Sequence, residues 1–336
     1  MTAVKPPGKW IQGIDGSTPL IEAAKAIVEL RLEPVVTLLP LASARHAEDV
    51  EYIHQLRVAS RRADAALKAF RLSFGAKRWR KVHRRLRTIR RAAGAARTCD
   101  VHIMALAERL EQAPEEHRGA LAYALSRTQQ ERRQAQDAVD DAARRFPEAR
   151  LRKGHGKLLD SARLVTGTKL GGSHRLASAG ALGPTLLDAA MHQLPRAMHA
   201  VHDAAERDMR IFENLHQLRI ESKHLRYSME IFATCFDERF RKVLYPQMKV
   251  LQDHLGTIND AHEMALRFER YAASCTAETP AEEEPALHAG LERLAVAWRK
   301  ERALLSEVFL QWWAEFRTSG TLSALEEYLG AGSPKA

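Results

Sequence analysis

A histidine, a glutamine and an arginine recur with the same spacing in two places of the chain. Residues 54–62 read HQLRVASRR and residues 216–224 read HQLRIESKH, so that the second copy follows the first by 162 positions without a gap. On a helix, His54, Arg57 and Arg61 lie on one stripe. Cationic groups one helical turn apart stand about 5–6 Å from one another and form a row of donors, and each guanidinium can hold two phosphate oxygens. The motif therefore indicates binding of a polyanion.

The 162-residue offset extends beyond the motif itself. Arg87 corresponds to Lys249, and Gly94 corresponds to Gly256. Repetition at one fixed offset is the sequence signature of two related structural units. We therefore predict an extended leader and two related halves, at residues 1–17, 18–174 and 175–330.

The segment that follows the first motif is the most cationic of the chain, because no acidic residue occurs between Asp64 and Asp100. On a helix predicted over residues 77–93, four arginines share one stripe, with apolar residues opposite. These arginines are Arg80, Arg84, Arg87 and Arg91. Like charges in a row repel one another, so the stripe favours an anionic partner.

The elements that must position these residues are helices, since no stretch shows the sustained alternation of a strand. Helices are expected near 18–40, 48–72, 77–93, 97–113, 115–146, 158–165, 184–212, 215–236, 238–256, 258–274 and 286–316. Gly94 and Gly256 are each expected to end a helix. The predicted fold is all-α, with two antiparallel four-helix bundles related by an internal pseudo-two-fold axis.

Composition limits the partners and the compartment. The chain has 336 residues, with 52 Lys and Arg against 42 Asp and Glu, and this net charge of +10 favours a polyanionic partner. The three cysteines lie far apart without CxxC spacing, which fits a reducing compartment. The sequence has no signal peptide and no apolar run of about 18 residues. We therefore expect a soluble, cytoplasmic protein that does not contact a membrane.

Catalysis and metal binding find no support in the sequence. The histidines form no HxH, HExxH or HxxEH cluster, and no serine or cysteine nucleophile has a base at motif spacing. We expect no enzyme activity, catalytic residue, metal or cofactor. A nucleic acid is the alternative partner, although the basic stripes lack interleaved exposed aromatic residues and show no helix-turn-helix or RRM pattern.

Four segments in the right order resemble the CHAD family, the conserved histidine α-helical domain. They are HQLRVASRR, LRTIRRAAGAARTCD, LHQLRIESKHLRY and MKVLQDHLGTIND, which begin at residues 54, 86, 215 and 248. The resemblance implies two four-helix bundles around a basic groove that binds inorganic polyphosphate. The ExExK signature of the CYTH domain often attached in this family is absent, so a stand-alone member is expected. Asp64 departs from the family pattern, which usually has a basic residue there, and Thr98 replaces a common aspartate.

The resemblance and the cationic stripes together define the candidate polyphosphate ligands. They are His54, Arg57, Arg61, Arg62, Arg80, Arg84, Arg87, Arg91, His216, Arg219, Lys223, Arg226, Lys242 and Lys249. For the two motif histidines, a hydrogen bond within the bundle and direct contact with the anion are equally compatible with the sequence. Association with polyphosphate granules in the cytoplasm is the corresponding expectation for location.

Overall fold

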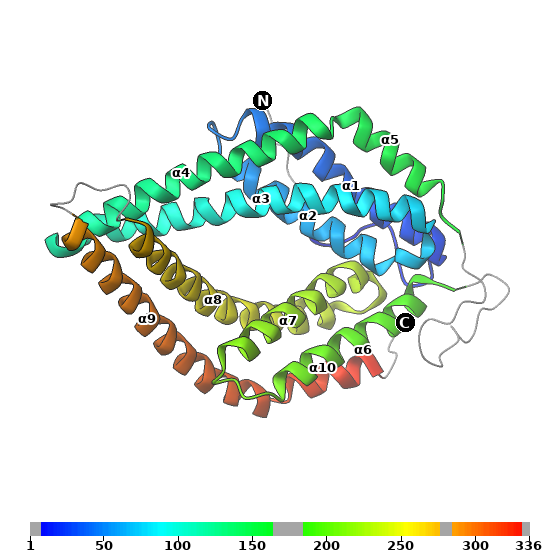
Figure 1. Cartoon of the computed structure of the whole chain (residues 1–336). Helices are drawn as coiled ribbons and strands as arrows, with labels where there is room; N and C mark the ends of the chain where they lie inside the picture. The colour runs from blue at the N-terminus through cyan, green and yellow to red at the C-terminus, as the bar shows by residue number, and fades with distance from the viewer. Residues whose placement is uncertain (1–7, 164–183, 276–283, 331–336) are drawn as a thin grey trace.

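The chain is all-α, as the sequence predicts. The computed structural model describes residues 8–163, 184–275 and 284–330, and within these ranges it contains helices and two isolated bridges but no strand (Figure 1). The predicted boundary between residues 174 and 175 and the end of the short helix expected at 158–165 lie outside the described residues. No helix of the described part is long and apolar enough to cross a membrane.

The first half is built from five helices and a short 3₁₀ turn. These are α1 (Leu20–Ala44), α2 (Glu51–Ala69), η1 (Arg71–Ser73), α3 (Ala76–Glu111), α4 (Glu115–Arg145) and α5 (Glu148–Leu159). The first motif lies on α2, and the cationic segment that follows it forms the first part of α3.

The described part of the second half also contains five α-helices, together with a short 3₁₀ turn and a short π-helical turn. Its elements are α6 (Leu186–Ala205), α7 (Phe212–Phe232), η2 (Ala233–Cys235), η3 (Phe240–Leu244), α8 (Tyr245–Ser274), α9 (Glu284–Thr318) and α10 (Thr321–Gly330). The second motif lies on α7. The capping box of Thr185 and Asp188 fixes the start of α6, since each side chain binds the backbone N–H of the other residue.

The prediction that Gly94 and Gly256 end helices is wrong. Both glycines lie inside single long helices, α3 and α8. A glycine in a helix interior costs only about 1 kcal/mol relative to alanine. In α3 the buried residues Ala92, Ala93 and Ala96 on either side of Gly94 keep the helix packed against its neighbours, and this packing outweighs the propensity of one glycine.

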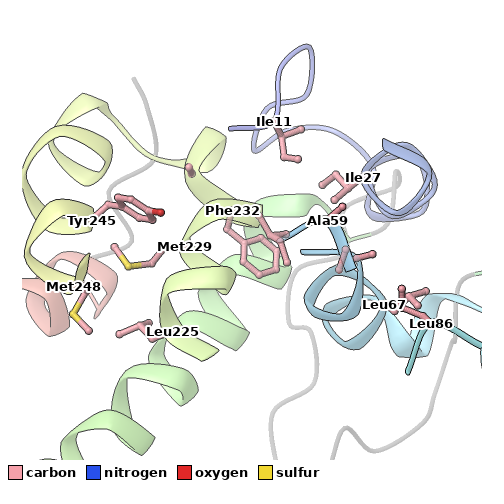
Figure 2. Close-up of a cluster of buried hydrophobic side chains, with 14 of the residues drawn as sticks. Ile11, Ile27, Ala59, Leu67, Leu86, Leu225, Met229, Phe232, Tyr245 and Met248 are labelled. Carbon is pink, nitrogen blue, oxygen red and sulfur yellow. The ribbon is translucent and has the colours of Figure 1, made fainter. Parts of the chain in front are cut away.

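The two halves share one hydrophobic core. Phe70 at the end of α2 meets its counterpart Phe232 at the end of α7, with ring centroids 6.1 Å apart in an edge-on arrangement. Figure 2 shows Phe232 between residues of the first half, such as Leu67 of α2, and residues of its own half, such as Met229. The ends of the two motif helices are therefore fixed against each other by buried aromatic side chains.

A second hydrophobic cluster joins the halves at a distance from the first. It contains Leu106 of α3, Leu121 of α4, Phe268 of α8 and Leu291 of α9, all buried. Figure 1 shows the hairpins α3–α4 and α8–α9 converging at this end, opposite α5. The helices α3 and α8, which follow the motif helices, therefore contribute to both hydrophobic clusters.

Candidate functional site

Four cationic side chains from the two motif helices converge between the halves. They are Arg57 and Arg61 of α2 and Arg219 and Lys223 of α7, which we call the central basic cluster. All four are half-buried, and their charges act on one another across the two helices. The sequence predicts these residues individually, and the structure brings them together.

The environment of the cluster disfavours its own charges. Burial, together with the charges of Arg219, Arg61 and Arg57, lowers the pKa of Lys223 to about 6. Burial and the neighbouring Arg61 also lower the pKa of Arg57 to about 10. Desolvation and like-charge repulsion both penalise the cationic forms, and an anion placed here would offset the repulsion. Asp260 of α8 is a carboxylate that acts on the cluster and offsets part of the repulsion.

Arg97 of α3 is a member of this site that sequence reasoning missed. Its charge lowers the pKa of both His54 and Arg57, although burial is the largest cause for each. A signal for it was present, because Arg97 stands 162 positions before Asn259, whose Oδ1 lies 3.2 Å from Nδ1 of His216. The same offset therefore relates the α3 neighbour of His54 to the α8 neighbour of His216.

The two motif histidines have different surroundings. His216 is exposed and its ring nitrogen is engaged by Asn259. Nδ1 of His54 is buried and meets no hydrogen-bond partner, and burial lowers the pKa of this imidazole below its ordinary value. Without an anion, His54 is therefore neutral at pH 7, with an unsatisfied ring nitrogen next to the cationic residues.

The predicted arginine stripe of α3 is exposed along its whole length. Arg80, Arg84, Arg87 and Arg91 form neither a hydrogen bond nor an ion pair through their side chains with any residue of the described ranges. We call these four residues the α3 stripe. Its donors are open to a ligand.

Lys249 and Lys242, the predicted ligands of the second half that lie outside α7, differ in whether an ion pair occupies them. Lys249 of α8, which corresponds to Arg87, is exposed and has no ion pair with the described residues. Lys242 lies in the π-helical turn η3 and pairs with Glu238 at 2.6 Å. A ligand at Lys242 would therefore compete with a surface carboxylate, a pair worth less than about 1 kcal/mol.

Arg62 and Arg226 are held by one buried carboxylate. Arg62 Nε lies 2.9 Å from Glu230 Oε2, and Arg226 Nη1 lies 2.7 Å from Glu230 Oε1. The hydroxyl of Tyr245 donates to the same carboxylate at 2.8 Å. Arg226 Nε also donates to Gln252. These two predicted ligands therefore connect α2 to α7, and part of their donor capacity is used inside the protein.

Asp64, the departure from the family pattern, is surrounded by bases. Its carboxylate pairs with Lys68 at 2.9 Å, with His83 at 3.0 Å and with Arg90 at 3.0 Å. Hydrogen bonding to Lys68 and the nearby cations lower the pKa of Asp64 against the opposing effect of burial, which is the largest single influence. Asp64 therefore neutralises cations at the junction of α2 and α3. It forms no ion pair with Arg57 or Arg61.

No group of three or more His, Cys, Asp or Glu side chains that could hold a metal ion occurs within residues 8–163, 184–275 and 284–330. The site as described is a set of cationic donors, some open and some paired, on helices that buried contacts fix in place. Such a set can bind and orient phosphate oxygens.

The fold and this site define an all-α protein with a concentration of cations between two helical halves. The CHAD domain profile matches residues 37–269, which is more than half of the chain, and the chain therefore belongs to the CHAD domain family. None of the curated proteins compared with the chain matches it.

Two solved structures share the fold. The crystal structure of the CHAD domain from the plant Ricinus communis has a TM-score of 0.67 and 19% identity, covering 91% of this chain and 96% of that one. PptA from Streptomyces chartreusis has a TM-score of 0.54 and 19% identity, covering 88% and 100%. At this identity the likeness concerns the fold.

Proposed function

We propose that the chain is a non-enzymatic module that binds long-chain inorganic polyphosphate in a basic groove bordered by α2, α3, α7 and α8. The observation that carries the proposal is the central basic cluster, in which four half-buried cations face one another across the two halves. Some members of the CHAD domain family bind polyphosphate, which agrees with this chemistry.

The ligand must supply several negative charges at short intervals. The central basic cluster would hold one stretch of the polyphosphate chain, and the α3 stripe would hold the next, because its arginines are exposed and follow one another by a helical turn. The unsatisfied nitrogens of His54 and Arg219 would gain partners in the bound state. Arg97 is added to the proposed ligands because its charge acts on both His54 and Arg57.

A polyphosphate fits better than a nucleic acid, which is the alternative partner. Single-stranded nucleic acids bind proteins largely through stacking of bases on exposed aromatic rings. Trp79, the aromatic residue beside the α3 stripe, donates its indole N–H to the carbonyl of Leu67 at 2.6 Å and stacks on His83. It is therefore a packing residue rather than a stacking platform.

The test replaces Arg61 and Lys223 by glutamine together and measures binding of long-chain polyphosphate. Neither side chain has an ion pair with a described residue, so the fold should persist. We expect the affinity to fall by about 100-fold, since each charge-assisted contact contributes about 1.5–3 kcal/mol. The control variant Lys25→Gln with Lys300→Gln replaces two exposed lysines outside the cluster and should change affinity by less than about threefold. Equal losses in both variants would mean that net charge alone drives binding.

A competition experiment addresses the alternative partner. Polyphosphate should displace labelled single-stranded DNA or RNA at a far lower concentration of phosphate than the reverse displacement requires. Preferential retention of the nucleic acid would contradict the proposal. Release of orthophosphate from polyphosphate in the presence of Mg²⁺, if abolished by the Arg61 and Lys223 substitutions, would contradict the non-enzymatic part. Localisation to polyphosphate granules should likewise depend on these two residues.

A further inference from the structure

A second basic site lies between α3 and α5. A pocket of about 230 Å³ there is lined by six cationic side chains together with Val82 and Gly154, and no carboxylate is among its lining residues. The cations are Arg78, Lys81, Arg85, Arg150, Lys153 and Lys157. None of the six forms an ion pair with another residue of the described ranges. We call this the α3–α5 pocket.

The pocket is separate from the central basic cluster. Arg90 lies on the side of α3 that faces α2, where it binds Asp64. Arg85 stands five positions earlier, about 140° around the helix, and donates to the backbone carbonyl of Arg150 on α5 at 3.2 Å. Figure 1 shows α5 beside the beginning of α3, at the end of the molecule remote from the α4–α9 contact. The two sites therefore lie on different sides of α3.

The cations of the pocket repel one another. The charge of Arg85 is the main cause that lowers the pKa of Lys81, with further contributions from burial, Arg78 and Arg150. The pKa of Arg85 is itself lowered, first by burial and then by Arg150. Because six positive groups share a small concave space, the local potential attracts an anion strongly.

The lack of a side chain at Gly154 leaves room for Arg85 in the pocket. A Cβ atom added at Gly154 would stand 2.6 Å from Nη1 of Arg85. The absence of a side chain on α5 therefore allows the guanidinium of Arg85 to lie against this helix and line the pocket. This contact places a planar, bidentate donor beside the flexible lysine ammonium groups, a combination suited to phosphate oxygens.

We propose that the α3–α5 pocket binds a compact oligophosphate independently of the central basic cluster. The volume is below the range of about 300–1,000 Å³ typical of pockets for drug-sized ligands, which favours a small ligand of high charge density. The lining offers no aromatic ring on which a base could stack, so a nucleotide gains nothing beyond its phosphates. The ligand is either a short free oligophosphate or a segment of a longer chain that passes over the α3 stripe.

Calorimetric titration with tripolyphosphate tests the pocket in three double variants that each replace two basic residues by glutamine. Lys81→Gln with Lys157→Gln changes exposed residues of the pocket, Arg61→Gln with Lys223→Gln changes the central basic cluster, and Lys25→Gln with Lys300→Gln is the charge control. We expect the pocket variant to lose about tenfold or more in tripolyphosphate affinity and the other two to lose less than about threefold. Unchanged affinity in the pocket variant, or an equal loss in the central variant, would overturn the proposal.

Two further measurements refine this result. Gly154→Ala keeps the net charge but displaces Arg85, so it should weaken tripolyphosphate binding by about threefold or more, and full affinity in a folded variant would count against the pocket.

Adding saturating long-chain polyphosphate to the wild-type chain distinguishes the sources of the ligand. If tripolyphosphate still binds in the presence of the long chain, the ligand of the α3–α5 pocket is a free oligophosphate. If tripolyphosphate no longer binds to either the wild-type chain or the central variant, the ligand is a segment of the long chain. Both outcomes support an oligophosphate pocket. Failure of the central variant to lose long-chain binding would affect only the proposed function.

Discussion

Replacing Lys223 with methionine should stabilise the protein at neutral pH. The central basic cluster surrounds Lys223 with arginines, and its pKa falls from the ordinary 10.5 to about 6. At pH 7 the unfolded chain therefore carries a proton on Lys223 that the folded chain must release. The methionine side chain has a similar length and no charge, so the variant avoids this release and packs its stem in the same place.

The size of the effect follows from linkage. Since the folded pKa lies below the unfolded pKa, the stability of the wild-type chain rises with pH from about 6 to 10.5. At 1.36 kcal/mol per pKa unit this window corresponds to about 6 kcal/mol as an upper limit. The flexible stem of lysine can turn its ammonium toward solvent, which reduces the penalty. We expect Lys223→Met to gain about 1–3 kcal/mol at pH 7, with the gain disappearing as the pH approaches 10.5.

Chemical denaturation followed by the helical circular dichroism signal measures this difference at several pH values between 6 and 10. Lys242→Met is the control, because Lys242 is exposed and its ion pair within the described residues is a surface pair with Glu238. It should change stability by less than about 1 kcal/mol at every pH. A Lys223→Met variant that is less stable than the wild-type chain at pH 7, or whose advantage does not depend on pH, would refute the assignment of a desolvated, repelled ammonium.

Three other outcomes are expected. Polyphosphate affinity should fall as the pH rises above 6, because the bound anion favours protonated Lys223. Calorimetry in buffers of different ionisation enthalpy should detect the uptake of a proton on binding. An affinity that does not depend on pH would contradict this prediction. Glu230→Gln should destabilise the fold by about 3–5 kcal/mol, because the half-buried Arg62 and Arg226 lose their shared buried counterion; an unchanged denaturation midpoint would exclude that role. Arg84→Ala with Arg87→Ala should lower the affinity for long-chain polyphosphate by about tenfold and leave the stability of the protein unchanged. The slope of log affinity against log salt concentration should become smaller by about one to two. Unaltered binding would remove the α3 stripe from the site.

The sequence predicts the helices well because their apolar periodicity is strong, and it places the motif residues on the correct elements. It fails at Gly94, where local propensity predicts the end of a helix and tertiary packing continues it to Glu111. Propensity is a term of about 1 kcal/mol per residue, and burial of Ala93 and Ala96 against neighbouring helices exceeds it.

The candidate site is predictable only in part, since partners across helices do not follow from periodicity. The basic character of Arg62 is visible in the sequence, but its pairing with Glu230 across 168 positions is not. The α3–α5 pocket also escapes sequence reasoning, because it depends on the close approach of Gly154 to Arg85. Arg97 is an intermediate case, since the repeat offset relates it to Asn259 but its proximity to Arg57 required the fold.

The two separate hydrophobic contacts between the halves have a consequence for ligand binding. Because Phe70 and Phe232 meet at one place and the cluster around Phe268 joins the halves at another, these contacts oppose a separation of the halves that would relieve the repulsion between the cations. Folding has therefore already brought the donors together and removed part of their water before any ligand arrives. A polyanion that binds there loses its own freedom but need not organise the protein, and preorganisation of this kind increases affinity without adding a contact.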